Sequence, residues 1–133
     1  MTAYNPDGPI DGERRVAAGD LEWEEKSLPG CYEKTLFRHE ETGATIALIK
    51  FDKGAGIPIL HEHASNHFMY MLSGKYSYPD SGIVLEPGDF YGNQIGHLHG
   101  PTVALEETVF LEIYDGPHYP SRPEFYDNDE DAR

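Results

Sequence analysis

The chain has 133 residues, of which 38% are apolar and 12% aromatic, and its 24 acidic and 10 basic residues give a formal net charge of −14. This length predicts a single domain with its own core, and the composition excludes collagen-like and wholly disordered chains. The acidic charge makes nucleic acids and anionic membranes unexpected partners. Because the chain has no apolar run of 18 residues, no basic and apolar leader and only one cysteine, Cys31, we expect a cytoplasmic protein without a membrane span or an internal disulfide.

The two ends of the chain differ from its middle. Residues 1–20 contain three glycines and no apolar period, so we expect a loose N-terminal arm there. Residues 119–133 include a short acidic run, which predicts a solvated acidic C-terminal tail. Between them, residues 21–118 are predicted to form the one folded domain.

The middle of the chain has the pattern of β-strands. Turn residues separate short runs that are rich in β-branched and aromatic residues. These runs lie at residues 44–51, 68–72, 75–78, 83–85 and 108–114. Only residues 20–26 invite a helical turn. The short intervals between the runs predict an all-β sandwich or barrel.

The histidines gather among these predicted strands, since five of the seven fall between residues 61 and 99. His61 and His63 form an H-x-H pair. On a strand, both imidazoles leave the same face with Cα atoms roughly 6–7 Å apart, so the two rings can converge on one ion. A short predicted turn then leads to His67 on the next strand, and His99 can reach the site from across a barrel. One H-x-H pair is a weak indication, but four histidines in this order predict a metal site.

Residues 54–74 and 88–103 resemble the two sequence motifs of the cupin family. The first stretch has the glycine, the H-x-H pair and the closing glycine of the first motif, with one extra residue before the first histidine. The second has the glycines and the histidine of the second motif, with Gln94 and Val103 where cupins have proline and asparagine. The resemblance covers about residues 30–115. It implies an all-β fold, the double-stranded β-helix or jelly-roll barrel of cupins.

The cupin motifs imply metal ligands at His61, His63 and His99, and they place His67 where cupins usually have a glutamate. The resulting site has four histidines, or three if His67 turns away. It resembles the all-histidine cupins: the diketone-cleaving (acetylacetone) dioxygenases, cupins similar to the metal domain of the anti-sigma factor ChrR, and small four-histidine manganese cupins. Residues 32–50 also resemble the strand–turn–strand that precedes the motif in the first group.

An all-histidine site leaves the bound metal ion more positively charged than a site with a carboxylate ligand does. Because imidazoles are neutral, a divalent ion keeps its full positive charge, which favours an enolate or a carboxylate as the further ligand. We therefore expect one divalent transition metal as cofactor. Fe(II) is favoured, with Zn, Mn, Ni or Cu as alternatives.

Side-chain alternation predicts the wall of the cavity beside the metal. Met69 and Met71 lie an even number of residues after His67, so on a strand they face the same side as that histidine. Ile59 lies two residues before His61 and shares its face, and Val103 follows His99. They predict a mainly apolar pocket for a small carbonyl compound or its enolate, although the methionines would serve equally as plain core filling. His39 and His118 are expected to be exposed.

Three functions remain open from the sequence. The first, which we rank highest, is a non-haem Fe(II) dioxygenase that cleaves a C–C bond of a small β-dicarbonyl or related ketone. The second is a Zn or Mn lyase, isomerase or hydrolase that activates a carbonyl; an inward glutamate near the ligands would favour it, and none is evident. The third is a non-catalytic metal- or ligand-binding cupin. A homodimer is expected, to which the N-terminal arm could add a strand.

Overall fold

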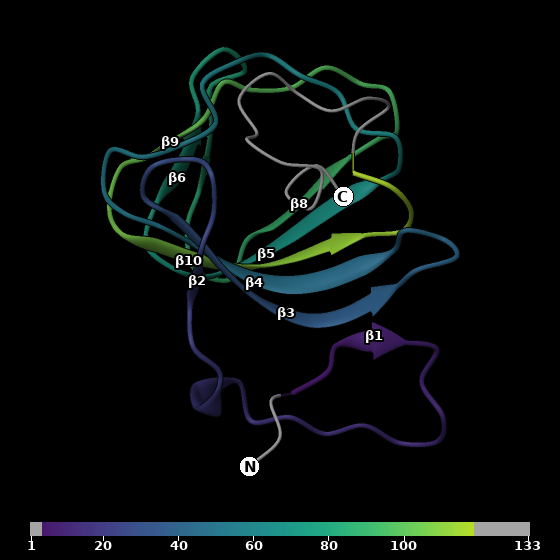
Figure 1. Ribbon diagram of the computed structural model, residues 1–133. Helices are drawn as coiled ribbons and strands as arrows, with labels where there is room; N and C mark the ends of the chain where they lie inside the picture. The colour runs from purple at the N-terminus through teal and green to yellow at the C-terminus, as the bar shows by residue number, and fades with distance from the viewer. Residues whose placement is uncertain (1–3, 119–133) are drawn as a thin grey trace.

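Figure 1 shows a computed structural model of the chain, which describes residues 4–118. Within this range the regular structure is β-strand, apart from one 3-10 turn, η1 (Ala18–Asp20). The strands are β1 (Asp7–Gly8), β2 (Glu24–Glu25), β3 (Cys31–His39), β4 (Thr45–Phe51), β5 (His67–Ser73), β6 (Tyr76–Tyr78), β7 (Ile83–Leu85), β8 (Phe90–Asn93), β9 (Val103–Ala104) and β10 (Thr108–Tyr114). No helix in the described range is long and apolar enough to cross a membrane.

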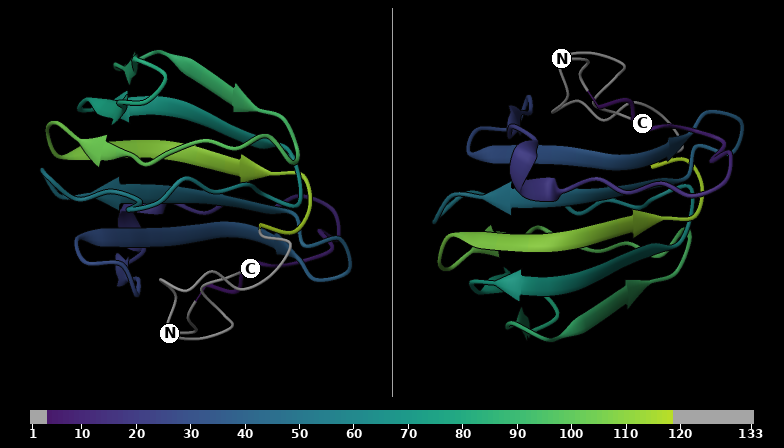
Figure 2. Two further views of the ribbon diagram at one scale, coloured as in Figure 1. Left: turned by 90° about the horizontal axis from the view of Figure 1, so that it is seen from above. Right: turned by 90° about the horizontal axis from the view of Figure 1, so that it is seen from below.

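The strands form two sheets. The larger sheet has the order β1-β3-β4-β10-β5-β8, with β2 paired to β3, and the smaller sheet has the order β7-β6-β9. The last strand, β10, lies between β4 and β5 and pairs antiparallel with both. Figure 2 shows this arrangement from two sides, with β10 in the middle of the larger sheet. The all-β jelly roll that the cupin motifs implied is confirmed.

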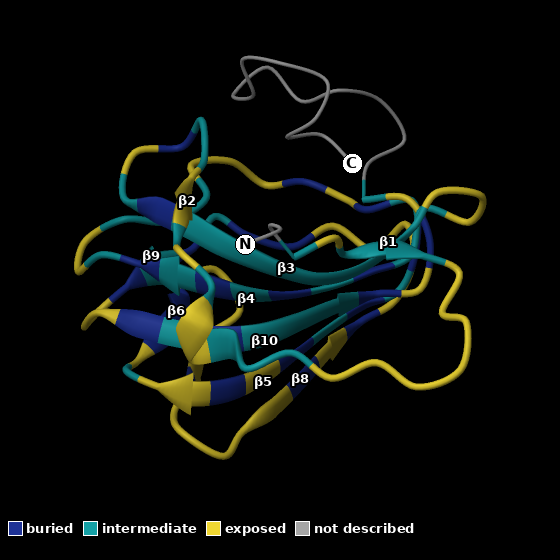
Figure 3. Ribbon diagram, turned by 60° about the horizontal axis from the view of Figure 1, so that its bottom comes forward, coloured by how far each residue is buried: buried dark blue, intermediate teal, exposed yellow. Residues whose placement is uncertain are grey.

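Alternation of the side chains puts one face of the larger sheet into the core. Along β4, every second residue from Thr45 to Phe51 is buried, and the residues between them are half-buried. The buried Phe51 stacks on Tyr76 of β6, with ring centroids 5.3 Å apart, so the core lies between the two sheets. Figure 3 shows a similar alternation on β5 and β8, where the outward-facing residues are largely exposed. Between the sheets, inward-facing residues of β5 and β10 line an internal cavity.

Part of the N-terminal segment is attached to the larger sheet. Strand β1 pairs parallel with β3 of its own sheet, and Arg38 Nε lies 2.8 Å from Asp7 Oδ1. Further along, the Trp23 ring packs on the outer face of β3 and β4. The Nζ atoms of Lys34 and Lys50 lie 4.7 Å and 4.8 Å from its centroid, as in cation–π contacts. The segment therefore adds its strand to its own sheet. The acidic tail at residues 119–133 lies outside the described range.

Candidate metal centre

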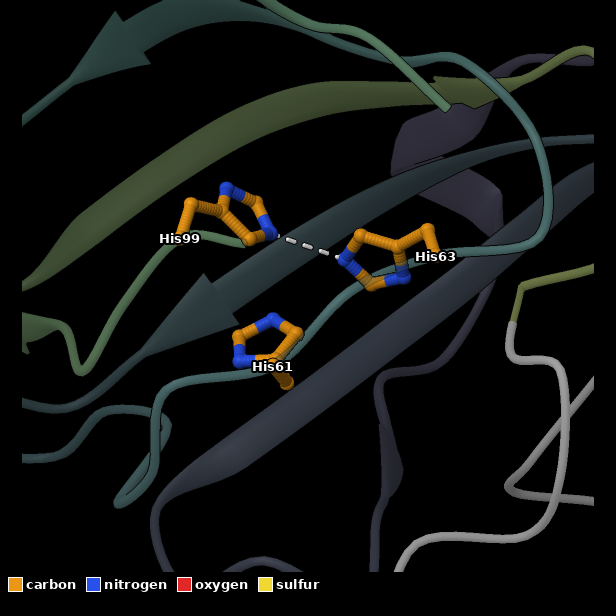
Figure 4. A group of neighbouring side chains, drawn as sticks. All are labelled: His61, His63 and His99. Carbon is orange, nitrogen blue, oxygen red and sulfur yellow. Dashed lines mark hydrogen bonds between the residues drawn. The ribbon is translucent and has the colours of Figure 1, made fainter. Parts of the chain in front are cut away.

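Three histidines from two distant segments meet inside the barrel (Figure 4). His61 and His99 form an isolated β-bridge, in which each backbone N–H donates to the other residue's carbonyl oxygen at 2.9 Å and 2.8 Å. His63 follows two residues after His61 on the same segment. All three side chains are buried, and one nitrogen atom from each lies within 4.8 Å of the others.

One ring nitrogen of each histidine is already fixed by a hydrogen bond. The Nδ1 atoms of His61 and His63 lie 2.9 Å and 2.8 Å from two backbone carbonyl oxygens, those of Ile59 and His118. Because a carbonyl only accepts, both Nδ1 atoms carry the proton and both Nε2 atoms keep a lone pair. The Nδ1 atom of His99 lies 2.7 Å from the hydroxyl oxygen of Tyr91. Metal-ligating histidines are oriented in this way by partners of their second nitrogen.

The Nε2 atoms of two of these rings have the spacing of metal ligands. The Nε2 atoms of His63 and His99 lie 2.9 Å apart (Figure 4, dashed line). Two nitrogen ligands at right angles, each about 2.1 Å from one ion, are about 3 Å apart. The three side chains therefore fit a divalent metal ion. Imidazole suits several transition metals, so the identity of the ion is not set by this donor set.

Burial keeps the three imidazoles neutral. Loss of solvation lowers the pKa of His63 to about 2 and that of His99 to about 3, and repulsion from neighbouring histidines adds to both shifts. Burial also lowers the pKa of His61, against a backbone hydrogen bond that raises it. At neutral pH the rings are thus in the form that binds a metal.

His67, the fourth predicted ligand, lies beside this cluster. Its Nε2 atom lies 2.9 Å from Glu112 Oε2, and its ring stacks on Tyr114 with centroids 4.4 Å apart. The ring centroids of His67 and His63 are 4.9 Å apart. The Nδ1 atom of His67 is buried and has no hydrogen-bond partner among the described residues. Metal binding by His67 remains a prediction, and this unpaired nitrogen is the atom that would provide it.

Glu112 is an inward glutamate that we did not expect. It lies on β10 between Phe110 and Tyr114, both buried, and it lines the same cavity as the histidines. Burial would raise the pKa of its carboxyl group, but the hydrogen bond with His67 and nearby positive charges lower it below the ordinary value. The alternation along β10 was the signal that could have identified it.

His118 is also placed differently from the prediction, which had it exposed. Its Nε2 atom lies 2.8 Å from Thr45 Oγ1, its ring stacks on Tyr114 at 3.9 Å, and its carbonyl oxygen accepts the hydrogen bond from His63. His118 therefore closes one side of the cavity and orients a candidate ligand. No spacing in the sequence marked this role, because it depends on a long-range contact with β4.

The predicted apolar wall is only partly found. Met69 lines the cavity, whereas Met71 is buried in the core. Ile59 is 45% exposed, and Val103 is half-buried away from the cavity. Their places are taken by Ile57 and Thr102. The parity prediction does not agree with the structure at Ile59 because residues 52–60 form no strand, and buried and exposed side chains do not alternate there.

The cavity is small and has a charged side. Its volume is about 50 Å³, which is room for a few waters. Lys26, Glu33 and Glu112 line it together with the histidines and with apolar side chains such as Met69 and Phe110. Apolar side chains make up the larger part of the lining, and these three charged residues interrupt it.

Solved structures of three proteins share this fold. Acetylacetone dioxygenase from Acinetobacter johnsonii is 19% identical with a TM-score of 0.66, and 88% of this chain and 82% of that chain are covered. A protein provisionally assigned as an acetylacetone dioxygenase, from Methylibium petroleiphilum PM1, is 18% identical with a TM-score of 0.74 and 94% coverage of both chains. The polyketide cyclase RemF from Streptomyces resistomycificus is 20% identical with a TM-score of 0.65 and 90% coverage of both.

At these identities the likeness shows the fold alone. No curated protein matches the chain. The model of the ChrR cupin-like domain, however, matches residues 11–118, which confirms the resemblance seen in the two motifs, and the chain therefore belongs to this family of cupins.

Proposed function

We propose that this cupin is a metal-dependent enzyme that binds a small carbonyl compound as its enolate, and that with Fe(II) it cleaves a C–C bond of a β-dicarbonyl or related ketone with O2. The observation that carries the proposal is the cluster of three buried, neutral imidazoles, His61, His63 and His99. Neutral ligands leave a divalent ion its full charge, which favours an anionic chelating substrate. The fold is compatible with this reaction, since an acetylacetone dioxygenase shares it.

The residues around the cluster have separable roles in this proposal. A bound divalent metal would supply the positive charge that stabilises an enolate and, as iron, a redox-active centre through which O2 could react with the substrate. Tyr91 and the carbonyl oxygens of Ile59 and His118 orient the three rings. Met69 excludes water from one side of the cavity. Glu112 lines the same cavity beside His67, where its carboxylate can accept a hydrogen bond from the substrate.

Glu112 also gives weight to a second candidate function. A Zn- or Mn-dependent lyase, isomerase or hydrolase needs a base near a polarised carbonyl, and a cavity carboxylate is suited to that role. Its pKa is lowered, so the carboxylate is ionised at neutral pH. This candidate needs no O2, which separates it from the first.

The two candidates are tested on untagged protein. Its metal content is measured first, and the Fe(II)-loaded protein is then mixed with a panel of β-diketones, including acetylacetone, in an oxygen electrode. The dioxygenase proposal expects O2 uptake with one carboxylic acid and one dicarbonyl fragment formed per O2. Product formation that is equally fast without O2 would favour the second function. Tight diketone binding with no product in either case would leave a ligand-binding cupin.

Two further expectations belong to the same proposal. We propose that the protein is a homodimer, as is common among cupins, and that it works in the cytoplasm, as its single cysteine led us to expect. Because β1 pairs with β3 of its own chain, the dimer would form without that strand. Light scattering coupled to size-exclusion chromatography measures the mass, and a monomer at micromolar concentration would contradict the dimer.

A further inference from the structure

Three charged side chains form one wall of the cavity that holds the histidine cluster. They are Lys26, Glu33 and Glu112, and all three line the cavity. Their side chains are only 13%, 19% and 16% exposed. Charged groups are rarely this buried unless they are paired or have a function.

The strand register explains how the three groups meet. Glu33 points inward from β3 and Glu112 points inward from β10, and the two strands are separated by β4. In the row that contains Glu112, the residue opposite on β4 is Ala47, whose small side chain leaves space above the sheet. Lys26 reaches this space from the turn before β3, where its Nζ atom lies 3.2 Å from Glu33 Oε1. Its charge also acts on the Glu112 carboxyl group.

Structural stability alone does not account for this wall. Glu33 lies in the neighbouring row, opposite Ile49 of β4, and Ile49 in turn lies opposite Phe110 of β10; both apolar residues pack in the core. Burying ions costs several kcal/mol each before pairing, and apolar replacements of buried ion pairs are often neutral or stabilising. In this wall Glu33 is paired with Lys26 and Glu112 with His67, so ammonium and carboxylate groups lie side by side at the surface of the cavity. A ligand in the cavity could hydrogen-bond to both kinds of group.

We propose that Lys26, Glu33 and Glu112 bind a hydroxyl group of the substrate, so that the substrate is a hydroxylated carbonyl compound. This inference rests on the proposed function, because it assumes that the carbonyl oxygens bind at the histidine cluster. A hydroxyl group both accepts from an ammonium group and donates to a carboxylate, which matches the wall. A carboxylate on the substrate would be repelled by the two glutamates, and a hydrocarbon chain would make no hydrogen bond to the wall.

The proposal predicts a specific preference that mutation can remove. The Zn-loaded protein is titrated by calorimetry with acetylacetone and with the analogue that carries one terminal hydroxyl group. We expect the wild-type protein to bind the hydroxylated compound roughly tenfold to a hundredfold more tightly, the range for hydrogen bonds to charged groups. Lys26→Met and Glu33→Gln should lose most of this preference and keep the affinity for acetylacetone.

Matched controls exclude a general effect of charge removal. Lys50→Met removes a lysine from the outer face of β4, beside Trp23 and away from the cavity, and should keep the preference. Glu33→Gln keeps the size of the side chain, so it serves if Lys26→Met fails to fold. Metal content and melting temperature are measured for every variant.

The outcomes distinguish failure of the hydroxyl site from failure of the proposed function. Equal affinity for both compounds in the wild-type protein, or an unchanged preference in both Lys26→Met and Glu33→Gln, would overturn the hydroxyl site and leave the proposed function standing. Failure of both compounds to bind the Zn-loaded wild-type protein would overturn the proposed function, and the hydroxyl site with it.

Discussion

The two sides of the cavity are built differently. On one side, β4, β10 and β5 form continuous ladders, and they carry His67, Glu112 and Tyr114. On the other side, the three clustered histidines lie outside the strands, and only an isolated bridge joins His61 to His99. Side-chain hydrogen bonds to backbone oxygens and to Tyr91 orient their rings. The sheet therefore supplies a rigid wall of the cavity, whereas a bound metal would link the two irregular segments to each other.

The largest effect should come from removing ligands on the irregular side. His61→Ala and His99→Ala should each cut metal affinity by more than the 10- to 100-fold that is typical of residues beside ligands, and the double variant should purify without metal. Metal content by mass spectrometry after dialysis measures this. His67→Ala should have a milder effect, because three imidazoles remain. His39→Ala, at the half-buried end of β3 and outside the lining of the cavity, is the control. Full occupancy in the double variant would disprove the assignment.

The rigid side is tested by a core truncation. Phe110 is 2% exposed and stacks on Phe51, with centroids 6.2 Å apart. Phe110→Ala should lower the free energy of unfolding by about 3–5 kcal/mol, as truncations of buried aromatic residues do. Urea unfolding of the metal-free protein measures it. Metal content per folded molecule should stay near that of the wild type, and a parallel loss of metal would show that the two sides are not independent.

The irregular side should also make the metal-free protein sensitive to acid. The pKa values of His63 and His99 are about 2 and about 3 in the folded protein, against about 6.5 in an unfolded chain. Below pH 6.5 the unfolded chain therefore binds protons that the folded protein does not, so acid favours unfolding. Each histidine should lower the free energy of unfolding by about 1.4 kcal/mol per pH unit below about pH 6, with no such loss above about pH 7.5.

Urea unfolding from pH 8 to pH 5 measures this slope, and His63→Gln supplies the comparison. Its slope should be smaller than that of the wild type, because one of the two proton-binding differences is gone. Identical slopes in the two proteins would contradict the assignment of depressed pKa values to these rings.

The smallest effect should come from the one side chain that orients a ligand ring. Tyr91→Phe removes the hydroxyl that lies 2.7 Å from His99 Nδ1 and should weaken metal binding roughly tenfold, the lower end for residues beside ligands. A Co(II)-loaded protein should also show a shifted visible spectrum. Tyr70→Phe, on the exposed outer face of β5, is the matched control and should change neither property. An unchanged Co(II) spectrum and affinity in Tyr91→Phe would refute the orienting role.

The features that the sequence predicted correctly depend on local regularity. Strand alternation and the cupin spacing were enough for the all-β fold, for the inward position of Met69 and for the grouping of His61, His63 and His99. The same alternation, applied to β10, would have placed Glu112 on the inner face.

The features that were missed depend on contacts between distant segments. Ile59 lies where no ladder enforces alternation, so its parity carried no information. His118 is held by Thr45 and Tyr114, and Lys26 enters the cavity through a pairing with Glu33 across a turn. None of these contacts has a spacing that a single sequence reveals.

The most direct test of the central claim is anomalous X-ray diffraction from crystals of the untagged protein, collected at the absorption edge of the metal that it carries. The account predicts one anomalous peak about 2.0–2.3 Å from the Nε2 atoms of His61, His63 and His99. A peak bound elsewhere, or metal-loaded crystals with no peak among these three rings, would contradict it.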